Sequence, residues 1–566
     1  MFFRFFCLSL HCKTTCMLSS CLSFIFLALM RFVVIPVQFD DVKLQSGEEQ
    51  LTSLCVRAQK YFEHQFSPDG SFRFDLTRTV TLSKGIAYYG SNYSERKDVL
   101  LSEALKEACE QLNPEIDFSL YDNDGDGAVD NVCLIVAGTN EASGGSPDHI
   151  WPAHRHLGQE RASLMVDGKH IDSYTVCTEM DGKGNWSGVG LFCHELAHSF
   201  GLVDMYDTDL SLSGGESEGL RRTSLMDMGC YNGGGETPPN FNAIDHELLS
   251  LGSCRTLEKG DYLLQSIDRG HEYFRIDGDV EGEYFLLECR SSRDWDSPLG
   301  IDGLVIYHID KSSNNALWSD YYNSNLSASQ RWEYMQINNN PAHPCAYISS
   351  VLSGQTDRKE AFLNFWDSSS GSLAICFNGM DSQGRASFSV LEPIRITSQS
   401  IFQTSVILRW SVDPEIKGIS GIEIGWEDSD GVSSVRSLDP GCRSFTIENL
   451  RPRSRYKISL KLICESGQYT LNSSFVTKYY HEGTYPYIYL SGSLRHDDGA
   501  FFVGSKIELS IYNAPDALGT EWFFEGKSIK ADADGFFTLE RSGELKAVIH
   551  YDDMSTEVIT KRITVK

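Results

Sequence analysis

Residues 194–204 dictate a helix that is followed at once by a sharp turn. They read His-Glu-Leu-Ala-His-Ser-Phe-Gly-Leu-Val-Asp and overlap an amphipathic stretch, residues 187–200, that predicts a helix. A spacing of four residues puts His194 and His198 on the same face of that helix. The glycine of the pattern caps the helix and lets the chain turn, so that Asp204 can return a carboxylate toward the two imidazoles.

These residue types at this spacing are typical of a zinc site. Two imidazoles on one helix face can hold a zinc ion about 2.0–2.1 Å from each nitrogen, and Asp204 can supply a third ligand. Glu195 lies about 100° further round the helix, too far to be a ligand but close enough to take a proton from a water molecule at the metal. The alternative is a surface helix with solvated side chains. Against it, a chain with 15 histidines contains His-Glu-x-x-His by chance only roughly 0.03 times.

A second group of metal-binding residue types lies at 122–130. Alternate positions are aspartates and the sixth position is Gly127, as at the start of an EF-hand calcium loop. The twelfth position is Cys133 rather than glutamate, so the loop is not a complete EF-hand and Asp130 closes it instead. The alternative is a solvated acidic turn. We expect a structural calcium ion, pinning the turn into the next strand, held by Asp122, Asp124, Asp126, the Ala128 carbonyl and Asp130.

Composition and charge exclude several classes of protein. With 566 residues, of which 41% are hydrophobic, the chain is long enough for roughly three or four domains and is not disordered throughout. The 78 acidic residues outnumber the 49 basic ones and leave a formal net charge of -29. Because such a chain repels phosphate backbones and has no run of Lys and Arg, we expect no nucleic-acid partner.

The first half of the chain mixes strand and helix signals. Apolar, β-branched runs at 31–39 and 130–137 predict strands that are buried on both faces. Residues 95–112 predict a helix, which Pro114 follows. This mixture continues to about residue 252 and predicts an α/β or α+β domain.

Strand signals dominate the second half. Runs at 283–288 and 304–309 are strand-like, and from about residue 392 short alternating strands separated by turns predict β-sandwich domains. Trp410 lies in one such alternating strand, and residues 450–456 resemble the tyrosine-corner segment of fibronectin type III domains. These two features predict a fibronectin type III-like domain there, and the strands after it predict a second sandwich.

Residues 1–30 carry the membrane-directed feature of the sequence. An apolar run at 17–30 follows Arg4 and Lys13, which is the arrangement of a signal peptide and is shorter than a membrane-spanning helix. We therefore expect export. The chain has 16 cysteines, and the twelve beyond residue 21 include no Cys-x-x-Cys pair and lie mostly in apolar runs, which indicates buried free thiols.

The zinc-site pattern, with Met205-Tyr206-Asp207 after it, resembles the immune inhibitor A-type secreted zinc metallopeptidases, a metzincin-like family. The resemblance covers about 31–390. It implies protein or peptide substrates, export from a bacterial cell, zinc held by His194, His198 and Asp204, and catalysis by Glu195. Similar acidic loops recur in the family. The segments that carry the resemblance include 33–41, 61–66, 80–83, 88–90, 150–155, 224–227, 231–232, 283–288 and 307–310.

The family also has a Met-turn, in which a methionine forms an apolar floor beneath the metal. Met226 fits this place best and Met228 is the alternative, although either is compatible with an ordinary core position. Tyr231 follows the Met-turn and is a candidate for stabilising an oxyanion.

Three further residues near the pattern are ambiguous. Cys193 precedes the first histidine and points about 100° away from it, so we expect a core thiol. His154 and His156 could bind a metal as a pair on one strand, but with a full ligand set elsewhere we expect them to line the substrate cleft or to be structural.

Together these signals predict a multidomain chain: an α+β, zincin-like metallopeptidase domain, a β-rich region and two β-sandwiches. The predicted function is a secreted or surface-attached zinc metalloendopeptidase that acts as a monomer, whose sandwiches bind glycan or a cell surface. The alternative is a non-catalytic adhesin with a relict zinc domain, against which the intact Glu195 argues. The predicted divisions are 1–30 (signal segment), 31–252 (peptidase domain), 253–390 (β-rich extension), 391–478 (fibronectin type III-like) and 479–566 (Ig- or PKD-like sandwich).

Overall fold

The computed structural model divides the chain into two compact units, one ending at Leu391 and the other beginning at Glu392, with the short stretch 368–372 grouped with the second. No helix among the described residues is long and apolar enough to cross a membrane. The expected signal segment lies outside the described part almost entirely. The structure describes residues 29–566 except 95, 210–213, 315–317, 320–324, 358, 367–369, 466, 479–484, 493–494, 515–516, 533 and 552–555.

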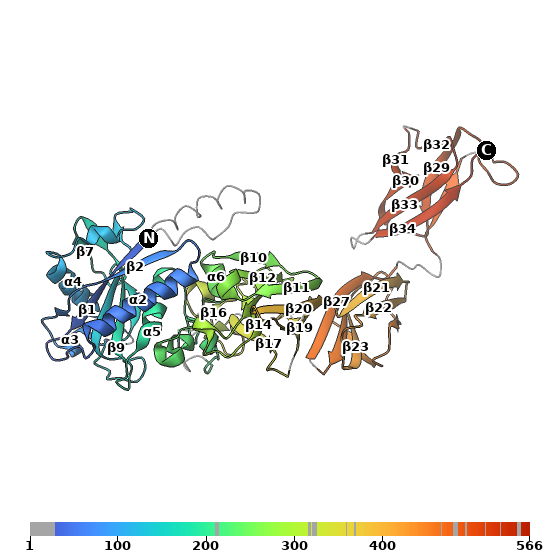
Figure 1. Cartoon of the computed structure of the whole chain (residues 1–566). Coiled ribbons are helices and arrows are strands. Elements are labelled where there is room, and N and C mark those ends of the chain that lie inside the picture. The colour runs from blue at the N-terminus through green and yellow to red at the C-terminus, as the bar shows by residue number, and fades with distance from the viewer. Residues whose placement is uncertain are drawn as a thin grey trace. The chain divides into compact units, whose positions relative to one another are not determined.

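The N-terminal part of the first unit is built on a mixed sheet in the order β2-β1-β5-β9-β6, with β3 beside β1 (Figure 1). Strands β1, β2, β5 and β9 run parallel, and β6 runs antiparallel to β9 at one edge. The elements of this part are β1 (Leu29–Gln38), α2 (Glu48–Gln65), β2 (Ser71–Leu76), β3 (Val80–Thr81), α3 (Ile86–Tyr89), α4 (Leu101–Leu112), β4 (Ala128–Val129), β5 (Val132–Thr139), β6 (Ala153–His156), β7 (Leu164–Val166), β8 (Lys169–Ile171), β9 (Ser173–Met180), α5 (Gly188–Ser199), α6 (Ala243–Leu248) and the 3-10 helices η1 (Phe118–Tyr121), η2 (Arg221–Thr223) and η3 (Met228–Gly235).

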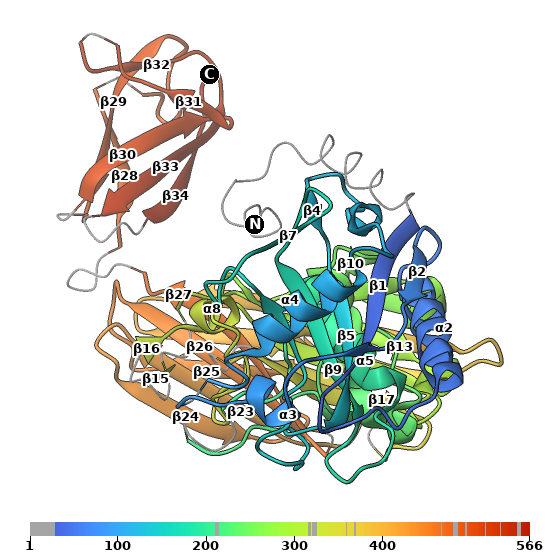
Figure 2. The same ribbon diagram turned by 90° about the vertical axis from the view of Figure 1, so that its left-hand side faces the viewer.

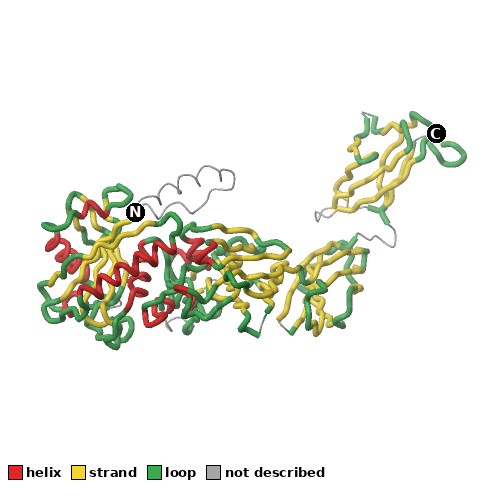
Figure 3. The backbone as a smooth tube through the Cα atoms, viewed as in Figure 1, coloured by secondary structure: helices red, strands yellow, loops and turns green. Residues whose placement is uncertain are grey.

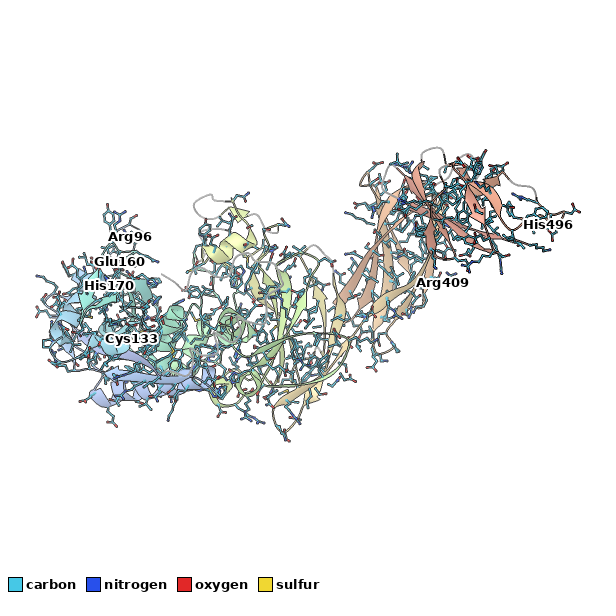
Figure 4. The ribbon with its side chains drawn as sticks, turned by 90° about the horizontal axis from the view of Figure 1, so that it is seen from above. Arg96, Cys133, Glu160, His170, Arg409 and His496 are labelled. Carbon is cyan, nitrogen blue, oxygen red and sulfur yellow. The ribbon has the colours of Figure 1, made fainter. Side chains whose placement is uncertain are left out.

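Strand β1 is apolar and buried from Phe32 to Val37 because both faces of the sheet are covered there. Phe32 and Val34 face the core formed with α2 and α5, whereas Val33 and Ile35 face the core formed with α4. Figure 2 shows α2 and α4 on opposite sides of the sheet. Cys133 of β5 is buried inside this fold (Figure 4), as expected for a free thiol that packs like a small apolar residue.

The helix predicted at 95–112 begins only at Leu101. Upstream, Asp98 has a positive φ of 47° and a buried carboxylate that accepts hydrogen bonds from the Trp151 amide and the Arg155 guanidinium. A left-handed residue interrupts a right-handed helix, so the helix begins six residues later than the apolar spacing indicated.

Residues 253–391 add two antiparallel-rich sheets, β10-β12-β13-β14-β17 and β11-β20-β19-β18, and the change to strands is clear in Figure 3. Tyr284 and Tyr307 of this part belong to the same buried cluster as Leu196 of α5. The hydrophobic core therefore runs across residue 252. The elements are β10 (Ser253–Thr256), β11 (Gly260–Gln265), α7 (Ile267–Gly270), β12 (Glu272–Asp277), β13 (Glu283–Arg290), η4 (Asp294–Asp296), β14 (Gly303–Asp310), β15 (Trp318–Ser319), β16 (Asn325–Leu326), α8 (Ala328–Glu333), β17 (Ala346–Ser353), β18 (Glu360–Asn364), β19 (Ser370–Met380) and β20 (Arg385–Leu391).

The first part of the second unit is a sandwich of the sheets β21-β22-β25 and β24-β23-β26-β27. Trp410 is buried between them, and the Tyr456 hydroxyl accepts a hydrogen bond of 2.9 Å from the Arg451 amide, which is a tyrosine corner. The predicted fibronectin type III-like fold is confirmed. Its strands are β21 (Ile394–Ile401), β22 (Ser405–Val412), β23 (Ile419–Asp428), β24 (Ser433–Leu438), β25 (Ser444–Glu448), β26 (Arg455–Cys464) and β27 (Gly467–Val476).

The C-terminal part is again a sandwich, of the sheets β28-β29-β32 and β31-β30-β33-β34. Its core contains Leu490, Ile507 and Leu545. The strands are β28 (Tyr487–Ser491), β29 (Ser505–Tyr512), β30 (Ala517–Phe524), β31 (Lys527–Ile529), β32 (Phe537–Leu539), β33 (Gly543–Tyr551) and β34 (Thr556–Ile563).

Candidate metal centre and active site

Helix α5 carries the two histidines and is buried along most of its length. It packs against the central strand β9 on one side and against η3 on the other. The close approach to η3 depends on Gly190, because a Cβ atom there would lie 2.0 Å from the carbonyl oxygen of Cys230. The helix therefore sits in a fixed position between the sheet and the segment after the predicted Met-turn.

Backbone carbonyl groups orient both imidazoles. His194 Nδ1 lies 2.8 Å from the Leu225 carbonyl oxygen, and His198 Nδ1 lies 2.9 Å from the Leu202 carbonyl oxygen. A carbonyl oxygen can only accept a hydrogen bond, so Nδ1 carries a proton on each ring, and in the neutral ring Nε2 is the nitrogen that presents a lone pair. Protein zinc sites commonly use this arrangement to fix the tautomer and direction of a histidine ligand.

Asp204 completes the cluster from the turn after the helix. Gly201 has a φ of 103° and donates its N–H to the His198 carbonyl, which closes the helix and reverses the chain. Asp204 Oδ1 then lies 3.3 Å from His194 Nε2 and 3.4 Å from His198 Nε2. The ligand atoms of the three residues all lie within 4.8 Å of one another.

The cluster fits a zinc ion chemically. Asp204 Oδ1 is buried, receives no hydrogen bond from the described residues that meets standard geometry, and faces Nε2 of both histidines. Two imidazole nitrogens and one carboxylate oxygen form a common ligand set of catalytic zinc sites, which leave a further position open. Burial alone would raise the pKa of Asp204, but the adjacent histidines hold it well below its usual range.

Glu195 lies buried next to this cluster. Burial raises the pKa of its carboxyl group, and the neighbouring His194 and His198 oppose that shift. Among the residues that the structure describes, none donates a hydrogen bond to the Glu195 carboxylate. A carboxylate in this state is available to take up a proton at the cluster.

The two candidate Met-turn residues differ sharply in burial. Met226 is 0% exposed, whereas Met228 is 54% exposed. The Met226 carbonyl accepts a hydrogen bond of 2.8 Å from the Met205 amide, next to Asp204, and Leu225 before it binds His194. The backbone of this turn therefore holds both the His194 ring and the segment that follows Asp204. Its buried methionine is Met226.

Two tyrosines lie near Glu195, one of which the sequence reasoning missed. Burial, with the charges of Asp204 and Glu195, raises the pKa of Tyr206 far above its usual value. Burial, with Cys230 and Glu195 nearby, also raises the pKa of Tyr231. Tyr206 follows Asp204 by two residues, and this position close to a predicted ligand was the signal that could have identified it.

The ambiguous residues lie outside the cluster. Cys193 is fully buried, and burial raises the pKa of its thiol well above the ordinary value. His154 Nε2 lies 2.9 Å from Ser173 Oγ, and His156 Nδ1 lies 2.9 Å from Asp172 Oδ2. Burial lowers the pKa of His154 to about 3, and His156 and His198 nearby add to this effect. The edge strand β6 therefore brings His154 near the cluster.

The acidic loop forms a separate cluster of Asp122, Asp124 and Asp130, whose carboxylate oxygens lie within 4.8 Å of one another. Asp122 Oδ1 is buried without a hydrogen-bond partner among the described residues, while Lys169 Nζ lies 2.5 Å from Oδ2. Asp126 is not in the cluster, and its Oδ1 accepts a hydrogen bond of 2.8 Å from the Ala128 amide. The structure thus brings together three of the four predicted carboxylate ligands.

Comparisons with known proteins identify the N-terminal region. Residues 43–253 match the family described as immune inhibitor A peptidase M6, catalytic domain. This region is therefore similar to the catalytic domain of the M6 metallopeptidases. The M6 family implies zinc, which agrees with the chemistry of the cluster. The domain contains every residue of both clusters.

Curated bacterial proteins also match. The pre-pro-metalloprotease PrtV of Vibrio cholerae serotype O1 (strain M66-2) is 25% identical over 284 residues, which is 42% of this chain and 30% of that protein. Immune inhibitor A of Bacillus thuringiensis subsp. alesti is 27% identical over 239 residues, which is 36% of this chain and 34% of that protein. The chain thus spans about a third of the length of the curated relatives it matches.

Solved β-sandwich structures are similar to small parts of the chain. A fibronectin type III domain of human collagen XX is 24% identical and covers 14% of this chain and 88% of that chain, with a TM-score of 0.13. A computationally redesigned β-sandwich protein is 20% identical and covers 16% of this chain and 92% of that chain, with a TM-score of 0.14. The fold of the second unit rests on its strand order and tyrosine corner.

Proposed function

We propose that the chain is a zinc metalloendopeptidase whose metal is held by His194, His198 and Asp204. Backbone carbonyl groups hold the two histidine rings so that both Nε2 atoms face Asp204 Oδ1, which is buried and accepts no hydrogen bond from the described residues that meets standard geometry. This arrangement is the observation that carries the proposal. The match of residues 43–253 to a metallopeptidase family supports it. One zinc ion per chain would serve catalysis.

Each protein group has a distinct role in the proposed reaction. When bound, zinc supplies Lewis-acid chemistry, which lowers the pKa of water and polarises a peptide carbonyl. Glu195 takes the proton of the attacking water and delivers it to the departing amine. Tyr231 is the candidate donor to the oxyanion, and the nearby Tyr206 is a second one. Met226 forms the apolar floor beneath the histidines.

We further propose that the acidic loop holds a structural calcium ion through Asp122, Asp124 and Asp130. Asn123 ties the loop to the start of β1, because its Oδ1 accepts from the Arg31 amide at 2.8 Å and its Nδ2 donates to the Arg31 carbonyl. An ion in this loop would therefore stabilise the edge at which β1 and β5 enter the sheet. The Ala128 carbonyl is a further candidate ligand, and Asp126 would join only if the loop rearranges.

The proposed substrates are proteins or peptides, met outside a bacterial cell by a secreted or surface-attached monomer. Both curated relatives are bacterial, and one carries the name of a metalloprotease. The two sandwiches of the second unit would bind glycan, a cell surface or large substrates. The acidic balance of the chain leaves nucleic acid outside this proposal.

The deciding experiment replaces Glu195 with glutamine and measures zinc content and peptide hydrolysis together. Glu195→Gln keeps the size of the side chain but removes the proton acceptor, so zinc should stay near one per chain while turnover falls about 10²–10⁴-fold. A digest of an unbiased peptide library by the wild type would define the cleavage preference. Unchanged turnover in Glu195→Gln would refute the mechanism, and a wild type without peptidase activity would favour the adhesin.

A further inference from the structure

The third ligand of the metal cluster lies in a segment that the β-rich extension holds in place. The loop between α8 and β17, residues 336–345, contains three consecutive asparagines, and we call it the asparagine loop. Asn338 Nδ2 donates a hydrogen bond of 2.8 Å to the Met205 carbonyl, 133 residues earlier in the chain. Met205 directly follows Asp204, so this bond holds the Met205–Tyr206 peptide, one residue beyond the ligand.

Asn338 is fixed on both sides of its amide. Its side chain is 0% exposed, and its Oδ1 accepts a hydrogen bond of 3.1 Å from the Ala346 amide at the start of β17. The loop is itself anchored, because Cys345 donates to the Ile337 carbonyl and accepts from the Asp310 amide at the end of β14. The side-chain amide of Asn338 therefore links the start of β17, in the extension, to the segment that follows Asp204.

A second asparagine adds a parallel connection. Asn339 Oδ1 accepts hydrogen bonds from the Thr208 amide at 3.0 Å and from Thr208 Oγ1 at 3.1 Å. On its other side the same segment is held by the bond from the Met205 amide to the Met226 carbonyl. The ligand-bearing turn is thus clamped between the Met-turn of the M6 domain and the asparagine loop of the extension.

We propose that Asn338 is a positioning residue for the metal site, acting through Asp204, and that residues 253–391 are part of the metal centre rather than an accessory region. This inference rests on the proposed role of Asp204 as a ligand. Without the Asn338 amide, the buried Met205 carbonyl loses its partner, and the segment that follows Asp204 is held at Met205 only through its N–H. Partners that orient a ligand in this way typically change metal affinity 10–100-fold when they are removed.

The test measures zinc affinity of the full chain by chelator competition, together with the melting temperature of the zinc-free protein. Asn338→Ala should raise the zinc Kd about 10–100-fold. Asn340→Ala is the matched control, because Asn340 is buried in the same loop but its Oδ1 accepts from the Ala342 amide within that loop. Asn340→Ala should leave the zinc Kd unchanged. Excess zinc should restore the turnover of Asn338→Ala.

A double-mutant cycle separates positioning from a general loss of stability. If Asn338 acts through Asp204, then adding Asn338→Ala to Asp204→Ala should not weaken zinc binding further. Should Asn338→Ala fail to fold, Asn339→Ala provides a milder loss of the same clamp and should raise the zinc Kd above that of Asn340→Ala. A tight-binding wild type with unchanged affinity in both Asn338→Ala and Asn339→Ala, or additive effects in the cycle, would overturn this inference alone. A wild type without zinc affinity would overturn the proposed function as well.

Discussion

The two carboxylate-containing clusters differ in what their ligand atoms already contact. In the histidine cluster, backbone carbonyl groups contact Nδ1 of each ring. Asp204 Oδ1, His194 Nε2 and His198 Nε2 face one another. In the acidic loop, backbone amides and Lys169 already contact the carboxylates. The first cluster is therefore preorganised for a metal, and the second can fold around its own hydrogen bonds and adapt to an ion afterwards.

This difference has a cause in the elements that carry the ligands. A buried helix fixes two ligands at a repeat set by its own geometry, whereas a short loop of aspartates lets each side chain turn to the nearest amide. We therefore expect the histidine cluster to depend strongly on each ligand. In the acidic loop, we expect a single substitution of an aspartate to weaken ion binding only in part.

The largest effect should come from Asp204→Ala. Removing a direct ligand should weaken zinc binding more than the 10–100-fold typical of an indirect partner, that is by more than about 100-fold. Zinc content after dialysis against a chelator measures this loss. The paired control is Asp124→Ala, which should keep zinc, and equal zinc retention in both variants would contradict the assignment of Asp204.

Calcium removal should have the next largest effect, on stability. An ion that binds only the folded protein at 100 times its Kd stabilises it by about 2.7 kcal/mol, so a calcium chelator should lower the melting temperature by several degrees. Combining Asp124→Ala with Asp126→Ala should abolish that shift without removing zinc. A full calcium-dependent shift in the double variant would show that the ion lies elsewhere.

The single variants sharpen this result. Because Asp126 turns toward the Ala128 amide, Asp126→Ala should reduce the calcium-dependent shift less than Asp124→Ala does. Melting curves with and without calcium measure the order. The reverse order would mean that the loop rearranges when it binds the ion.

A smaller effect should follow pH. Burial and the charges of Asp124 and Asp122 raise the pKa of Asp130 to about 6. The folded pKa lies above the unfolded value of 3.8, so the group favours the folded state below pH 4 and loses that contribution as pH rises through 6. Calcium competes with this proton, so the calcium-dependent shift should shrink as pH falls below about 6. Asp130→Asn should remove this pH dependence, and a pH dependence that persists in the variant would assign it to another group.

The smallest effect should come from deleting the second unit. All residues of both clusters lie before Leu391, where the first compact unit ends. A chain ending there should cleave short peptides like the full chain and lose activity only on large or surface-bound proteins. Failure of the shortened chain to fold would show that the sandwiches stabilise the first unit.

The sequence predicted features that depend on local spacing and missed those that depend on distant contacts. The pairing of His194 with His198 follows from helix geometry, and the return of Asp204 follows from a glycine that can adopt a positive φ. Asn338 was missed because 133 residues separate it from Met205 and no local pattern marks it. Asp126 was assigned to calcium because its spacing was correct, but a nearby amide competes for its carboxylate.

The close approach at Gly190 has a consequence for natural and laboratory variation. Any side chain there would strike the Cys230 carbonyl and push α5 away from η3. In a saturation mutagenesis screen for activity, this position should tolerate substitution as poorly as His194, although it takes no part in the chemistry. The positions that tolerate no substitution would then include the contact between α5 and η3 as well as the residues that bind the metal.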